Sequence, residues 1–144
     1  MKKVLLTAVL VLAMAGMAFA ADNATVSVSA SVVGTCKFNT TSANLAFGSL
    51  DPAVGGNASA SATLSFWCTK GATVTVSDNK SGTYNLSNGT NNIPYSVSYT
   101  PASTTGAGKS SPINLTVAGT IQEADWINAS AGAYTDTITV SINP

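Results

Sequence analysis

Short stretches in which apolar residues alternate with serine or threonine recur along the chain, and they constrain its fold more than any other feature. One of them spans residues 59–68, where every second residue is apolar. Another spans residues 134–142, where Ile138, Val140 and Ile142 alternate with hydroxyl-bearing residues. A period of two is typical of a β-strand with one buried face. The pattern therefore predicts an all-β fold.

Turn signals divide these stretches into seven or eight expected strands. Gly55-Gly56-Asn57 and Asn88-Gly89 are examples of such signals. Residues 101–111 are expected to form a Ser/Thr/Gly loop, and residues 122–133 an irregular segment. The strands are expected near residues 25–32, 44–50, 59–68, 72–76, 84–86, 93–99, 113–121 and 134–142. Many short strands with this spacing indicate a β-sandwich with an immunoglobulin-like outline.

The first 20 residues have the pattern of a secretory signal peptide. Lys2 and Lys3 precede an apolar run, and Ala18-Phe19-Ala20 places small residues at both positions that a signal peptidase reads. The run is shorter than the about 20 apolar residues of a membrane-spanning helix. We therefore expect cleavage after Ala20, export, and no transmembrane segment in the mature chain.

Charge and cysteine content restrict the partners of the mature chain. Beyond residue 20 it carries four lysines, no arginine or histidine, and six acidic residues, a net charge of −2. Such a chain offers no basic surface for nucleic acid. Cys36 and Cys68 are the only cysteines, and in an exported protein one disulfide between them is expected. By loop entropy this bridge would contribute about 3–4 kcal/mol.

The residues that could support catalysis or bind a cofactor are not grouped in a recognisable motif. The chain has no histidine to act as a base. Gly106 to Ser110 resembles a phosphate loop, but Ser103 stands where the first glycine is required. Glu123 and Asp125 fit solvated loop charges better than a calcium site or a glycosidase pair. We therefore predict no enzyme, no catalytic residue, no cofactor and no metal site.

Residues 25–32, directly after the expected cleavage site, are the most informative alternating stretch. Gly34-Thr35 is expected to act as a hinge between this stretch and Cys36, where the disulfide would begin the folded domain. The stretch could be the first strand of its own sandwich. It could also leave its domain and fill a groove in another copy, with main-chain hydrogen bonds providing affinity. The residues of its apolar face are Val26, Val28, Ala30 and Val32.

Five segments follow one another in an order that resembles a known family. They are residues 26–36, 45–50, 64–71, 117–121 and 132–142. Together they resemble the archaic chaperone–usher pilus subunits of the spore coat protein U domain family. The stretch from Asp78 to Ser111 has little counterpart there, and the chain ends on Pro144 where the family has an apolar or aromatic residue.

The resemblance implies an incomplete immunoglobulin-like sandwich that lacks its final strand. A periplasmic chaperone would lend that strand, and at an outer-membrane usher the N-terminal extension of the next subunit would replace it. The chain would then consist of a signal peptide (residues 1–20), a donor-strand extension (21–35) and a pilin domain (36–144). The implied donor residues are Val26, Val28, Ala30 and Val32, and the implied edge of the acceptor groove is Ile138, Val140 and Ile142.

The function expected from this resemblance is a structural subunit of a surface pilus that supports adhesion and biofilm formation. It would be exported through the periplasm and would polymerise with identical or related pilins. Two alternatives stay open. One is a self-contained secreted coat or matrix protein in which residues 26–32 complete their own sandwich. The other is a carbohydrate-binding sandwich, in which Trp126 would stack on a sugar.

Overall fold

A computed structural model describes residues 21–144, which fall into two units, the first ending at Ser31 and the second spanning Val32–Pro144. The expected signal peptide lies outside the described residues. Residues 21–31 contain no strand or helix, and all of their side chains are exposed. Val26 and Val28 are 80% and 89% exposed. The half-buried strand expected at residues 25–32 is therefore not formed within this chain.

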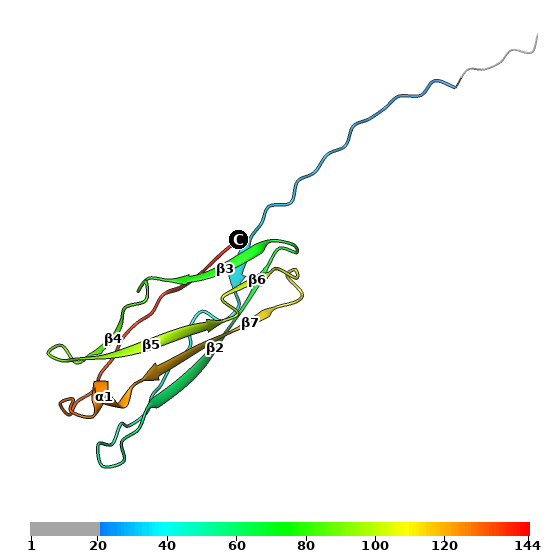
Figure 1. Cartoon of the computed structure of the whole chain (residues 1–144). Helices are drawn as coiled ribbons and strands as arrows, with labels where there is room; N and C mark the ends of the chain where they lie inside the picture. Colours follow the sequence, from blue (N-terminus) through cyan, green and yellow to red (C-terminus); the bar gives the residue numbers. More distant parts are fainter. Residues whose placement is uncertain (1–20) are drawn as a thin grey trace, which may run out of the picture. The chain divides into compact units, whose positions relative to one another are not determined.

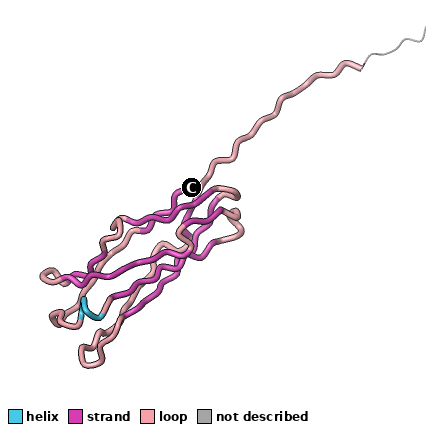
Figure 2. The backbone as a smooth tube through the Cα atoms, viewed as in Figure 1, coloured by secondary structure: helices cyan, strands magenta, loops and turns pink. Residues whose placement is uncertain are grey.

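The second unit is a sandwich of two antiparallel sheets (Figures 1 and 2). Its strands are β1 (Cys36–Phe38), β2 (Ala58–Cys68), β3 (Thr73–Asp78), β4 (Tyr84–Ser87), β5 (Asn92–Thr100), β6 (Ser103–Thr105), β7 (Ile113–Ile121) and β8 (Val140–Asn143). One sheet has the order β1-β2-β7-β5-β4 and the other β6-β3-β8. This architecture confirms the predicted all-β sandwich. Strands β1 and β8 are both edge strands.

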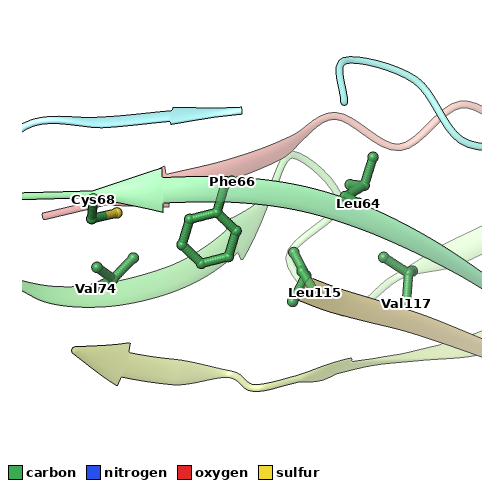
Figure 3. Close-up of a cluster of buried hydrophobic side chains, with 6 residues drawn as sticks. All are labelled: Leu64, Phe66, Cys68, Val74, Leu115 and Val117. Carbon is green, nitrogen blue, oxygen red and sulfur yellow. The ribbon is translucent and has the colours of Figure 1, made fainter. Parts of the chain in front are cut away.

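The centre of the sandwich is built on β2 and β7, which pair from Ala58↔Ile121 to Phe66↔Ile113. Their alternate side chains point inward, and Phe66, Cys68 and Leu115 are fully buried together with Val74 of β3 (Figure 3). The outward positions of both strands carry mostly serine and threonine. The period of two in the sequence therefore predicts correctly which face of each central strand is buried.

Two regions expected to be irregular contain regular structure. Ser103–Thr105 forms β6, which pairs with Thr73–Thr75 of β3 inside the predicted loop. Residues Glu123–Trp126 form α1, a single helical turn. The Trp126 indole Nε1 donates to the Gly56 carbonyl oxygen (3.1 Å), which fixes this turn against the start of β2. No helix within residues 21–144 is long and apolar enough to cross a membrane.

Two expected strands are not formed in full. Residues 44–50 belong to no strand, and the strand expected at residues 134–142 is reduced to β8 and an isolated bridge between Ser87 and Thr135. The alternating burial nevertheless persists, because Leu45, Phe47 and Ile138 are half-buried while their neighbours are exposed. These two segments keep the side-chain pattern of strands, but most of their backbone pairs with no strand.

Candidate functional site

A groove runs between residues 38–50 and residues 134–140, two segments whose backbone is largely unpaired. It consists of two cavities of about 510 Å³ and 690 Å³. The two cavities adjoin, because they share lining residues that include Leu45, Phe47 and Leu86. One wall is formed by residues 38–50 and the other by residues 134–140.

The first wall begins at the end of β1, beside β2. The backbone N–H groups of Asn39 and Thr40 both donate to the Ser65 carbonyl (2.7 and 3.2 Å). From residue 41 to residue 50 the described structure has no further hydrogen bond between backbone groups. Leu45 and Phe47 still point inward, and the Phe47 ring lies edge-on to Tyr95 with 5.8 Å between ring centroids. This wall is therefore held by side chains while its backbone stays free to pair.

The second wall is paired on one side only. Thr135 exchanges two backbone hydrogen bonds with Ser87 (2.9 and 3.0 Å). Thr139 accepts from the backbone N–H of Asn79 (3.1 Å), and Val140 begins the ladder with β3. In the described structure the backbone groups of residues 136–138 bond to no other backbone group. The side of this segment that faces the first wall carries no strand.

The floor of the groove is the apolar core. Leu64 and Val117, from β2 and β7, line the cavity nearer to β1. Ile93, Ile121 and Trp126 line the cavity nearer to α1, and all three are buried. The groove therefore follows the long direction of β2 and opens onto both hydrophobic clusters. A segment that filled it would need apolar side chains on one face.

A polar contact interrupts this apolar lining at Asp136. Its carboxylate accepts hydrogen bonds from Lys80 Nζ (2.6 Å) and from the Tyr95 hydroxyl (2.8 Å). Burial would raise the pKa of Asp136, but the hydrogen bonds from Lys80, Tyr95 and the Thr137 backbone outweigh it, so the pKa is lowered. Burial and the neighbouring Asp136 raise the pKa of Tyr95. The contact ties the second wall to β5 and to the loop after β3.

A second carboxylate, Asp78, stabilises the adjoining interior. It accepts from the hydroxyls of Tyr84 (2.7 Å) and Tyr99 (2.9 Å) and from the backbone N–H of Lys80 (2.7 Å). Burial opposes the charged form here too, yet these hydrogen bonds lower the pKa of Asp78. Within residues 21–144 no three His, Cys, Asp or Glu side chains come together as metal ligands. The polar groups of this region serve to hold the walls in place.

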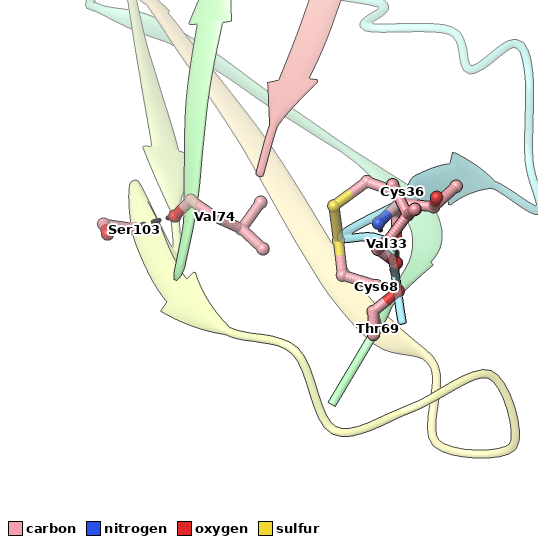
Figure 4. The surroundings of a disulfide bond; sticks show 7 residues. Val33, Cys36, Cys68, Thr69, Val74 and Ser103 are labelled. Carbon is pink, nitrogen blue, oxygen red and sulfur yellow. Dashed lines mark hydrogen bonds between the residues drawn. A yellow bond between two sulfur atoms is a disulfide. The ribbon is translucent and has the colours of Figure 1, made fainter. Parts of the chain in front are cut away.

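The predicted site residues lie in three places. Cys36 and Cys68 form a disulfide that joins β1 to the end of β2 (Figure 4). Among the residues proposed as a donor strand, Val26, Val28 and Val32 are 80%, 89% and 85% exposed, and Ala30 is exposed as well. Of the residues proposed as the groove edge, Ile138 and Val140 line the groove, whereas Ile142 lies beyond it against the core.

Neither the first wall nor the polar contact follows from the sequence. The alternation of Leu45 and Phe47 signals an inward face, but nothing in it indicates that the backbone lacks a neighbour. Tyr95 and Asp136 are 41 residues apart, and no local pattern links two residues at that separation. The structure therefore adds the first wall, the floor and the Lys80–Asp136–Tyr95 contact to the predicted site.

Comparison with known proteins assigns the chain to a family. The model of the Spore Coat Protein U domain matches residues 22–141, which include residues 21–31 almost entirely and both walls of the groove. A search of the curated proteins finds no match to the chain. Because the match spans most of the sequence, the chain belongs to the Spore Coat Protein U domain family.

Proposed function

We propose that this protein is a structural subunit of a surface pilus and that it polymerises by exchanging its N-terminal strand between copies. Its family consists of structural, pilin-type domains and is not an enzyme family. That membership is consistent with a subunit of a chaperone–usher pilus. Export through the periplasm, adhesion and biofilm formation belong to the same proposal.

The observation that carries the proposal is the groove with an unpaired backbone on both sides. Residues 41–50 and 136–138 make no hydrogen bond to another backbone group, although the Thr137 N–H donates to Asp136 Oδ1. Their other backbone groups can bond to a strand placed between them. Unpaired edges of this kind bind an added strand through main-chain hydrogen bonds, while pockets select alternate side chains. Ile138 and Val140 on one wall and Leu45 and Phe47 on the other supply those apolar pockets.

Residues 26–32 have the properties required of the incoming strand. Their apolar face is largely exposed in the chain that carries it, and their other face consists of serines. Burying three valines and one alanine would contribute on the order of 4–8 kcal/mol before the loss of chain entropy on ordering. The same segment provides no comparable stabilisation while it stays in solvent.

If each subunit donates one strand and accepts one strand in its groove, the subunits form a filament. Such a contact joins two different surfaces, so it continues from copy to copy instead of closing into a dimer. Before assembly the open groove exposes apolar surface beside unpaired edges, which favours aggregation. We propose that a periplasmic chaperone covers the groove in transit and that an outer-membrane usher exchanges it for the strand of the next subunit.

Gel electrophoresis of the native assembly tests the proposal. The protein is sheared from its cells and detected by antibody in denaturing gels, with unheated samples beside boiled ones. We expect a ladder of multiples that collapses to the monomer on boiling. Val28→Asp should abolish the ladder because it buries a charge in the groove. Ser29→Asp is the matched control, and it should keep the ladder because residue 29 lies on the opposite face.

A different gel pattern would contradict the proposal. A single monomer band in both lanes for the unmodified protein indicates a subunit that completes itself or does not polymerise. The self-contained coat protein would then describe the protein better, because Trp126 is 4% exposed and offers no ring face on which a sugar could stack. A ladder that survives Val28→Asp unchanged would mean that the contact between subunits does not use residues 26–32.

A further inference from the structure

Thr69, directly after β2, holds the residues that lead into β1. Its backbone N–H donates to the Thr35 carbonyl (2.9 Å), and the Thr35 N–H donates to its Oγ1 (3.0 Å). The same hydroxyl is within donating distance of the Val33 carbonyl (3.2 Å). Val33 and Thr69 lie beside the Cys36–Cys68 disulfide in Figure 4. Residues 33–35 therefore continue the line of β1 along the end of β2.

These contacts determine whether residues 26–32 can fill the groove of their own domain. To do so, the chain would have to reverse just before Cys36 and run back along β1. In an antiparallel hairpin, residues directly opposite each other share a face. Cys36 and Phe38 point toward the core, where they pack against the buried cluster. The length of the turn therefore decides which face of residues 26–32 enters the groove.

A two-residue turn would present the wrong face. Gly34-Thr35 suits such a turn, because glycine fits its first position. Val33 would then lie opposite Cys36, and the residues facing the groove would be the serines at positions 27, 29 and 31. The apolar face would point to solvent. The sequence thus permits the turn, but the turn fills the groove with hydroxyl groups.

A three-residue turn would present the correct face but requires the segment that Thr69 holds. With Val33–Thr35 as the loop, Val32 would lie opposite Cys36 and the valines would enter the groove. Such loops place their last residue in the left-handed region, which is unfavourable for the β-branched Thr35. Any longer turn with an odd number of residues also includes Val33–Thr35. Every reversal of the chain that turns the apolar face of residues 26–32 toward the groove must therefore break the hydrogen bonds between residues 33–35 and Thr69.

We propose that Thr69 is a positioning residue that keeps residues 33–35 extended, so that the N-terminal strand is withheld from its own groove and is given to a second copy of this chain. The inference rests on the proposed function and decides between donation within one chain and donation between chains. Gly34 supports it, because its φ lies outside the left-handed region in the held segment.

The test compares the mature chain with Thr69→Val and Thr69→Ser, each with its disulfide intact. Each protein is unfolded, refolded at low concentration, and mixed with a fluorescent synthetic peptide of residues 24–33. Light scattering after size-exclusion chromatography measures the monomer, and fluorescence measures peptide uptake. Valine has the shape of threonine without the hydroxyl, whereas serine keeps the hydroxyl.

We expect the unmodified monomer to take up the peptide and to polymerise when concentrated. Thr69→Val should increase the fraction of monomer that does not bind the peptide by at least threefold, because the N-terminal strand of each monomer then occupies the groove of the same monomer. Thr69→Ser should behave as the unmodified protein. Adding Val28→Asp to Thr69→Val should restore peptide uptake, since the strand can no longer fill its own groove. A general loss of stability would not be reversed by that second change.

The outcomes separate the inference from the proposed function. If Thr69→Val takes up peptide and polymerises like the unmodified protein, the role of Thr69 is wrong and strand exchange still stands. If Thr69→Val loses uptake and Val28→Asp does not restore it, Thr69 acts on folding alone and the inference is overturned. If the unmodified protein neither binds the peptide nor polymerises, the proposed function itself fails.

Discussion

The central strands and the walls of the groove carry the same side-chain pattern but differ in their backbone pairing. On β2 and β7, Phe66 and Leu115 are fully buried, and each strand has a neighbour on both sides. In the walls, Phe47 and Ile138 follow the same alternation but stay half-buried beside unpaired backbone. Alternation thus specifies which face turns inward. It does not specify whether the covering strand comes from the same chain.

A matched pair of phenylalanines gives the largest expected effect. Phe66→Ala should lower the free energy of unfolding of the isolated subunit by about 3–5 kcal/mol, since it leaves a cavity in the packed centre. Phe47→Ala should lower it by roughly 1–2 kcal/mol, because the half-buried ring loses less contact. Urea unfolding monitored by tryptophan fluorescence measures both values. Equal losses would mean that the first wall is as well packed as the centre.

The disulfide gives the next largest expected effect, and it anchors the beginning of the first wall. Cys36 and Cys68 are separated by 32 residues. Reduction should lower the free energy of unfolding by about 3 kcal/mol, since the unfolded chain regains the entropy of that loop. Urea unfolding with and without reductant measures the loss. If reduction did not change the urea concentration at the midpoint of unfolding, the disulfide would not restrain the unfolded chain.

Most of the central sandwich could be predicted from the sequence, whereas its open edge could not. The inward faces of β2 and β7 follow from the alternation of Leu64, Phe66 and Leu115, and the disulfide follows from two cysteines in a chain expected to be exported. Strand β6 was missed because its Ser/Thr composition is also that of a loop. Helix α1 was missed because one turn is too short to show a helical period.

The candidate site was predictable in its side chains and not in its connections. The family resemblance assigned Ile138, Val140 and Ile142 to the groove edge. Ile138 and Val140 line the groove, whereas Ile142 lies beyond it. The missing ladder at residues 44–50 has no local signal, because a strand without a partner has the same sequence pattern as a paired one. The contact between Tyr95 and Asp136 arises only when the fold brings β5 and the second wall together.

Gly119→Ala tests how closely the first wall packs on β7. A Cβ at Gly119 would lie 2.8 Å from Phe47 Cζ and 2.9 Å from Leu45 Cδ2. The substitution should lower the free energy of unfolding by about 1–3 kcal/mol, because the wall must move outward. Ala118→Ser, on the opposite face of the same strand, is the control and should change it by less than about 0.5 kcal/mol.

A pair of tyrosines gives the smallest expected effect and tests the polar contact of the second wall. Tyr95→Phe removes one hydrogen bond to Asp136 and should lower the free energy of unfolding by about 1 kcal/mol at pH 7. Tyr134→Phe is the matched control. Its hydroxyl donates to the Ser130 carbonyl (2.9 Å) and not to a carboxylate. Urea unfolding of both variants between pH 7 and pH 2 measures the difference.

The direction of the pH effect follows from the lowered pKa of Asp136 in the folded state. A carboxyl with a lowered folded pKa adds stability above its unfolded pKa of about 3.9, and this stability is lost as the pH falls through the folded value. The unmodified protein should therefore lose stability below about pH 4. The difference in unfolding free energy between it and Tyr95→Phe should become smaller there, because Asp136 becomes neutral. The loss of unfolding free energy caused by Tyr134→Phe should stay the same over this pH range. If the losses of stability caused by both substitutions stayed constant to pH 2, the hydroxyl of Tyr95 would not stabilise the charged form of Asp136.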